Sequence, residues 1–137
     1  MQSYSNLKIV TQARTFYNGP VLSVELKTKS GGSIVLQPNR SELLTTIDIC
    51  KLVIKDYPDN KEKVYSISDG IVYADKSSIN IITNDIILNS DIDLKKAESD
   101  RDKAISILSS NSDAEVISRF EIKLKKAINR INVSQNK

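Results

Sequence analysis

The most constraining feature of this 137-residue sequence is a change of periodicity between Ser90 and Ala97, in the segment SDIDLKKA. Before this segment, short runs rich in Val, Ile, Thr and Tyr alternate between apolar and polar residues, as half-buried strands do. After it, apolar residues recur every three or four positions, which is the period of an amphipathic helix. The sequence therefore predicts a sheet domain over residues 1–89 and a helical domain over residues 90–137.

The first part is typical of short strands separated by turns. In residues 21–28 the alternation places Leu22, Val24 and Leu26 on one face. Residue pairs that suit tight turns separate the runs: Asn18-Gly19, Gly31-Gly32, Asp59-Asn60, Asp69-Gly70 and Asp75-Lys76. Strands and turns at this spacing predict an antiparallel β-sandwich of about eight to ten strands.

The second part predicts two helices. Asp91 or Asp93 can cap a first helix that ends near Leu108. Ser112 and Glu115 have the spacing of a capping box and predict the start of a second helix. A short loop between two helices makes an antiparallel hairpin, which gives an α+β fold overall. A unit of about 45 residues buries little apolar surface alone, so we expect the hairpin to dock reversibly on another surface.

Composition excludes most catalytic chemistry. The chain has no His, no Trp, one Met and one Cys. Histidine acid–base catalysis, Ser-His or Cys-His nucleophiles and clustered Cys/His metal sites are therefore excluded. Cys50 lies in an apolar run and is expected to be a buried hydrophobe. We predict no catalytic residues, no metal, no secretory signal and no direct membrane insertion, because the apolar runs are far shorter than the roughly 20 residues a bilayer requires.

Positive charge is concentrated in the last helix. Residues 116–137 carry six basic residues and one acidic residue, a net charge of +5, whereas the whole chain carries only +3. One interpretation is a solvated basic face. Another is a surface for an acidic partner, whose association would be salt-sensitive. Nucleic acid is a weaker interpretation, because no aromatic platform or groove-reading motif accompanies the charge.

The ordered features resemble the epsilon subunit of F-type ATP synthases, named delta in mitochondria. The resemblance covers essentially the whole chain. It rests on the following segments: LKIVT, Phe16-Tyr17-Asn18-Gly19, Val21-x-x-Val24-x-Leu26-x-Thr28, Gly31-Gly32, Ile34 through Pro38, Leu43-Leu44-Thr45, Ser68-x-Gly70, IVYADKSSINIIT, Asp91-Ile92-Asp93, and Ala127, Arg130 and Val133 in KKAINRINV.

The resemblance implies a non-catalytic subunit of a rotary ATPase. The sandwich would bind the gamma subunit at the foot of the central stalk, and the hairpin would either fold beneath the catalytic head or extend into it and brake ATP hydrolysis. The basic helix would meet an acidic motif of the catalytic beta subunits. The candidate contacts are Arg119, Lys123, Lys126 and Arg130. The implied location is peripheral, at the cytoplasmic face of the cell membrane, through the complex.

Some bacterial members of the family bind ATP in the folded hairpin, through an I-D-x-x-R-A motif and later basic residues. The matching positions here are Ile92, Asp93, Lys96, Ala97, Lys103, Lys126 and Arg130. Lys96 stands where the motif has Arg and lacks the planar fork that makes two parallel hydrogen bonds. The upstream acidic residue of the ATP binders is Ile87 here. We therefore expect no cofactor, and regard ATP as the weaker alternative to Asp93 as a helix cap and Ile92 as a core contact.

The chain departs most from the family pattern in the loop that the resemblance assigns to the membrane rotor ring. The residues concerned are Ser33, Val35, Pro38, Asn39, Arg40 and Glu42. Arg40 and Glu42 add charge where the family has small or neutral residues. Either the ring has changed in parallel, or the subunit serves a specialised F-type-like ATPase without a standard proton-translocating ring. A free-standing binding module of the same fold is a further alternative.

Overall fold

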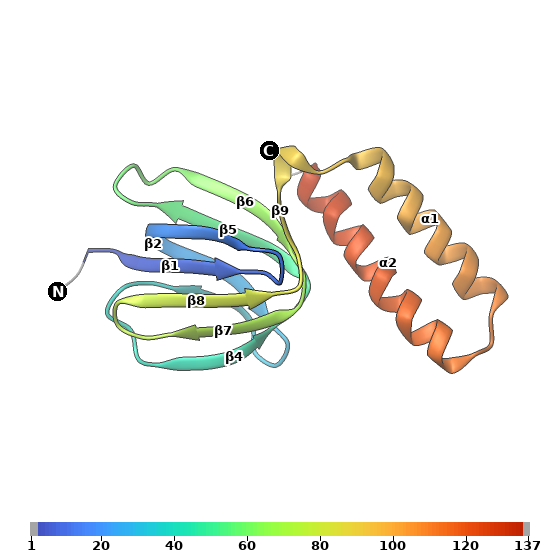
Figure 1. Ribbon diagram of the computed structural model, residues 1–137, viewed down its shortest axis with the longest axis horizontal. Helices are drawn as coiled ribbons and strands as arrows, with labels where there is room; N and C mark the ends of the chain where they lie inside the picture. Colours follow the sequence, from blue (N-terminus) through green and yellow to red (C-terminus); the bar gives the residue numbers. More distant parts are fainter. Residues whose placement is uncertain (1–2, 136–137) are drawn as a thin grey trace. The chain divides into compact units, whose positions relative to one another are not determined.

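The computed structural model describes residues 3–135. These residues fall into two compact units, a β-sheet unit that ends at Leu88 and a helical unit that begins at Asn89. Figure 1 labels both helices and the strands other than β3. The strands are β1 (Ser5–Val10), β2 (Thr15–Thr28), β3 (Gly32–Leu36), β4 (Leu43–Ile47), β5 (Cys50–Asp56), β6 (Glu62–Ile67), β7 (Gly70–Ala74), β8 (Ser78–Thr83) and β9 (Ile86–Leu88).

Strand β2 belongs to both layers of the β-sheet unit. Its first half pairs with β1, and the layer that contains β1 extends through β8 and β7 to β4. Its second half pairs with β3 on one side and with β5 on the other, and β5 continues through β6 to β9. Among the described strand pairs β1–β8 is parallel and the others are antiparallel. The predicted β-sandwich is confirmed, with one parallel pair that alternation alone did not indicate.

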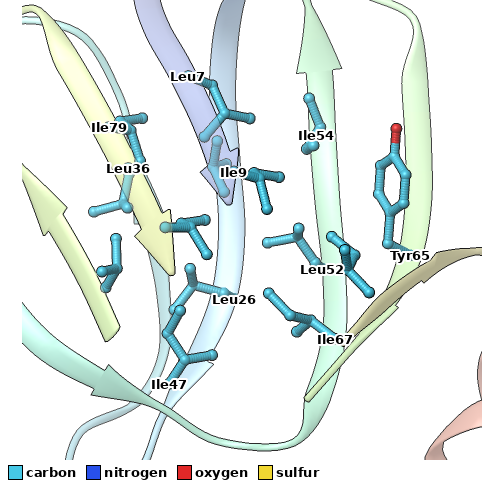
Figure 2. Close-up of a cluster of buried hydrophobic side chains, with 14 of the residues drawn as sticks. Leu7, Ile9, Leu26, Leu36, Ile47, Leu52, Ile54, Tyr65, Ile67 and Ile79 are labelled. Atoms are coloured by element: carbon cyan, nitrogen blue, oxygen red, sulfur yellow. The ribbon is translucent and has the colours of Figure 1, made fainter. Parts of the chain in front are cut away.

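The core lies between the two layers. In β1 the inward residues Leu7 and Ile9 alternate with the exposed residues Asn6 and Lys8, as the two-residue side-chain period of a strand requires. Figure 2 shows how side chains from both layers meet in this core. Its labelled members are Leu7, Ile9, Leu26, Leu36, Ile47, Leu52, Ile54, Tyr65, Ile67 and Ile79.

The prediction for β2 was wrong in two respects. Residues 15–20, with Asn18-Gly19, are paired with β1 as part of the strand and do not form a turn. The inward residues are Val21, Val24 and Leu26, and Leu22 is only half-buried. The pairing with β5 shifts register between Val21 and Ser23, and such a bulge inserts one residue that breaks the alternation.

Positive φ angles occur at two of the turns that the sequence predicted. Gly32 has φ 72°, which glycine adopts without a steric penalty, and it closes the turn between β2 and β3. Asn60 has φ 60° in the turn between β5 and β6, as an Asp-Asn turn permits. The turns predicted at Gly31-Gly32 and at Asp59-Asn60 are therefore confirmed.

The helical unit is an antiparallel hairpin of α1 (Leu94–Ser110) and α2 (Ala114–Ser134), preceded by the short 3₁₀ turn η1 (Asn89–Asp91). Asp93 caps α1, because its Oδ1 accepts from the backbone N–H of Lys96 at 3.1 Å. The cap predicted for α2 was wrong. Asp113, not Ser112, accepts from the backbone N–H of Glu115, at 2.9 Å. The combination of a sandwich and a helical hairpin confirms the predicted α+β fold.

Candidate functional site

The two helices of the hairpin meet through small and apolar side chains. On α1 the buried residues are Ala97 and Ala104, seven positions apart and hence on one face. On α2 they include Ala127 and Ile131. Alanine lets the two backbones approach closely, but it buries little apolar surface. The longer charged side chains beside this seam are therefore brought near one another.

A pocket of about 350 Å³ lies along one side of this seam. Its residues on α2 follow from helical spacing, since positions three and four apart share a face. Four of its lining side chains are cationic and one is a carboxylate. The lining residues are Asp100, Lys103 and Ala104 on α1, and Phe120, Lys123, Lys126, Ala127 and Arg130 on α2.

Phe120 organises the basic side of α2. The Nζ of Lys123 lies 4.6 Å from the centroid of the Phe120 ring, and the Cζ of Arg119 lies 5.4 Å from it. Cations are attracted to the negative face of an aromatic ring at such distances. The half-buried ring of Phe120 thus holds cations at the edge of the pocket.

The structure brings together part of the predicted nucleotide set. Lys103, Lys126 and Arg130 line the pocket. The other predicted members do not line it. Asp93 caps α1, and Ile92 precedes that helix. Ala97 is buried in the helical unit, and Lys96 forms a 3.6 Å ion pair with Asp100. A nucleotide role for these residues stays a prediction.

The predicted acidic-partner set lies on the same side of the hairpin. Three of its members, Lys123, Lys126 and Arg130, line the pocket, and Arg119 contacts the Phe120 ring beside it. The two predicted sets therefore overlap. Sequence reasoning missed Phe120 and Asp100 as pocket residues, although the three- and four-residue spacing of positions 120, 123, 127 and 130 could have indicated a shared face.

The residues predicted to face a rotor ring do not form one loop. Ser33 and Val35 belong to β3, and Ser33 adjoins the turn after β2. Pro38 to Glu42 follow the opposite end of β3. An extended strand advances about 3.3 Å per residue, so the strand separates them from Ser33. The prediction that these residues share one loop was therefore wrong, because two of them belong to β3 and the others to the connection before β4. Their contact with a rotor ring stays a prediction.

The connection after β3 is tied to a neighbouring turn. Asn39, with φ 63°, donates its backbone N–H to the carbonyl of Lys76 at 2.8 Å. In that turn, Oδ1 of Asp75 accepts from the backbone N–H groups of Ser77 and Ser78, both at 2.9 Å. These hydrogen bonds, with the one from Ser77 the largest contribution, hold the pKa of Asp75 below its usual value.

A second candidate surface lies on the outward side of β4, β7 and β8. Leu44, Ile82, Ile71 and Tyr73 are exposed by 69%, 62%, 48% and 42%. The register pairs Leu44 with Tyr73 and Ile71 with Ile82, so the four side chains are cross-strand or same-strand neighbours. We call these four residues the apolar face. A pocket of about 400 Å³ adjoins it and is lined in part by Ile71 and Ile82.

Within residues 3–135 no helix is both long and apolar enough to span a membrane. The same residues contain no group of three or more acidic or Cys side chains placed to hold a metal ion.

Comparison with known families accounts for both units. The ATP synthase delta/epsilon chain β-sandwich domain matches residues 4–89, and the long α-helix domain of the same chain matches residues 90–135. The chain belongs to the ATP synthase delta/epsilon family. Similar proteins include the ATP synthase epsilon chains of Mycoplasmopsis pulmonis, 38% identical over 95% of this chain and 92% of that protein, and of Mycoplasma mobile, 35% identical over 96% and 94%. The resemblance to the epsilon subunit is confirmed.

Solved structures agree on the fold of this epsilon-family chain. A chain in the cryo-EM structure of the Euglena gracilis mitochondrial ATP synthase, comprising OSCP, F1 and c-ring, has a TM-score of 0.82 at 19% identity, over 94% of this chain and 80% of that one. A chain in the central stalk and c-ring structure from Tetrahymena thermophila has a TM-score of 0.62 at 14% identity, over 98% of both chains.

Proposed function

We propose that this epsilon-family subunit is a non-catalytic part of the central stalk that binds the gamma subunit through its apolar face and modulates ATP hydrolysis through its hairpin. The observation that carries the proposal is the apolar face itself. Four large apolar side chains are exposed together on neighbouring strands. Contiguous apolar patches of this kind commonly mark protein–protein contacts.

The chemistry of the apolar face supports a permanent partner. Its four members are uncharged, and their strand positions direct them away from the core. The adjoining pocket is rimmed by polar residues, among them Gln12, Lys29 and Asp69. An apolar centre with a polar rim is the usual anatomy of an interface. The gamma subunit would therefore present a complementary apolar surface.

Substitution in the apolar face tests this proposal. Ile82→Lys places a charge at the centre of the contact, whereas Val35→Lys places the same charge at an exposed valine of β3 outside the apolar face. Ile82→Lys should weaken binding to the gamma subunit of the same organism by about thirtyfold or more, because central apolar contacts contribute about 2 kcal/mol or more. Val35→Lys should leave it nearly unchanged. Equal affinities for both variants in surface plasmon resonance would refute the assignment.

The hairpin would act through its basic side. Arg119, Lys123, Lys126 and Arg130 would meet the acidic motif of the catalytic beta subunits, and this contact would slow ATP hydrolysis. The chain would have no active site of its own. The complex would hold it at the cytoplasmic face of the cell membrane without insertion. Family matches across both units support a subunit over a free-standing module.

A second candidate function is regulatory binding of a phosphate-bearing ligand such as ATP in the hairpin pocket. The observation that favours it is the convergence of Lys103, Lys126 and Arg130 on one pocket. Lys126→Gln should weaken ATP binding by isothermal titration calorimetry, and Lys95→Gln, at an exposed position of α1 outside the pocket, should not. Identical titrations for the two variants would exclude the pocket as the site.

Whether the complex has a standard rotor ring is a separate proposal. We propose that it does, because the similar proteins are named ATP synthase epsilon chains. The alternative is a specialised F-type-like ATPase without such a ring. Purification of the intact complex through this subunit distinguishes them, since ring subunits would co-purify in the first case and be missing in the second.

A further inference from the structure

The hairpin pocket contains one negative group among its cations. Lys103, Lys123, Lys126 and Arg130 line it, and so does Asp100. The Oδ2 of Asp100 lies 3.6 Å from Nζ of Lys96, one helical turn earlier, and Lys96 does not line the pocket. The Asp100 side chain is 44% exposed and that of Lys96 is 71% exposed. An ion pair this exposed is weak, so Lys96 does not cancel the charge that Asp100 brings to the pocket.

We propose that Asp100 is a specificity-determining residue that limits how much negative charge the pocket accepts. The inference rests on the proposed binding of a phosphate-bearing ligand and adds a selectivity to it. The lining cations attract an oxyanion, whereas the Asp100 carboxylate repels it. Four cations outnumber this one carboxylate, so polyphosphates are still attracted, but the repulsion grows with each further negative charge on the ligand. Asp100 therefore reduces the gain in affinity from phosphate to pyrophosphate to triphosphate.

Coulomb's law gives the expected size of this selectivity. For unit charges about 6 Å apart in a partly hydrated pocket, with an effective dielectric constant of about 40 to 80, the repulsion corresponds to roughly a threefold to tenfold loss of affinity per ligand charge. Removal of the Asp100 charge should therefore improve binding in a graded series. Inorganic triphosphate should gain most, pyrophosphate less and phosphate least.

Asp100→Asn tests the inference, because it removes the charge and keeps the shape. Asp102→Asn is the matched control, since Asp102 is on the same helix, is exposed, pairs with Arg101 at 3.0 Å and does not line the pocket. The full-length chain is titrated with phosphate, pyrophosphate and triphosphate in isothermal calorimetry at low salt, and circular dichroism checks the helices. We expect the graded gain for Asp100→Asn and less than a twofold change for Asp102→Asn.

Three outcomes overturn the inference. The first is equal behaviour of the two variants, and the second is a uniform gain for all three ligands. The third is weaker binding by Asp100→Asn, which would mean that the carboxylate accepts a hydrogen bond from the ligand. If wild type and Asp100→Asn bind none of the three phosphates and also do not bind ATP, the proposed anion site fails as well. If the wild type binds phosphates and Asp100→Asn binds them equally well, only the proposed selectivity is refuted.

Discussion

Replacement of Gly70 by alanine should destabilise the sandwich at the junction of β7 and β8. A Cβ atom at position 70 would overlap the carbonyl oxygen of Ile82 and would lie 2.9 Å from the Cα of Thr83. Both are backbone atoms, which cannot rotate away as a flexible side chain can. The first residues of β7 must therefore move away from β8. This movement disturbs the pairing of Gly70 with Thr83 and of Ile71 with Ile82.

The magnitude follows from the two effects that such a movement combines. Overpacking costs about 1–3 kcal/mol, and loss of a terminal hydrogen bond of the β7–β8 pair costs about 1 kcal/mol more. We expect a loss of about 2–4 kcal/mol in the free energy of unfolding. Gly19→Ala is the matched control, because its Cβ would find only Tyr17 side-chain atoms, at 3.8 and 3.9 Å. It should be neutral or stabilise by up to about 1 kcal/mol, since alanine restricts the unfolded chain.

Urea unfolding followed by tyrosine fluorescence measures this difference selectively. All five tyrosines lie in the sandwich, at or before position 73, and the chain has no Trp, so the signal reports on this unit. With a denaturant slope of roughly 1 kcal/mol per molar urea, the midpoint of Gly70→Ala should fall by about 2 M or more. A midpoint equal to that of Gly19→Ala would show that β7 and β8 separate at little cost, and the packing argument would be refuted.

Further predictions concern the hairpin and one turn. Lys123→Glu combined with Lys126→Glu should raise the ATPase activity of the assembled complex. The same change should flatten the dependence of this activity on salt, because exposed charge pairs are screened by ions. An unchanged salt response in steady-state assays would contradict a contact with an acidic partner. Asp75→Ala should lower the urea midpoint at pH 7, and the deficit should vanish as the pH falls below the lowered pKa of Asp75, where the wild-type carboxyl is protonated and its contribution is lost. A deficit of equal size at both pH values would assign the effect to the side-chain hydroxyl contacts of the turn instead.

The division into sandwich and hairpin was predictable because it depends on local periodicity. Asp93 was also predictable as a cap, because its acceptor lies beside the amide it serves. The start of α2 was not, because Ser112 and Asp113 are adjacent residues that can both cap a helix and the sequence does not rank them. The reversed inward side at Leu22 depends on a bulge, which no pattern within the strand signals.

The apolar face was missed for a different reason. In β7 and β8 both sides carry apolar residues, so alternation does not tell Ile71 and Ile82 from the core residues Val72 and Ile81. Their exposure becomes visible only when non-local pairing fixes which side is covered. The hairpin pocket likewise needs the register of two helices, although the basic stripe of α2 is evident from spacing alone.

The sharing of β2 between the layers has a mechanical consequence. A part of a rotary machine experiences shear, and two stacked sheets without a shared strand would resist it through side-chain packing alone. Here the covalent backbone of β2 runs through the bulge at Val21–Ser23 from the layer of β1 into the layer of β5. If the gamma subunit binds the apolar face as proposed, torque applied there would pass along a continuous chain to the opposite layer, and the sandwich would turn as one stiff body.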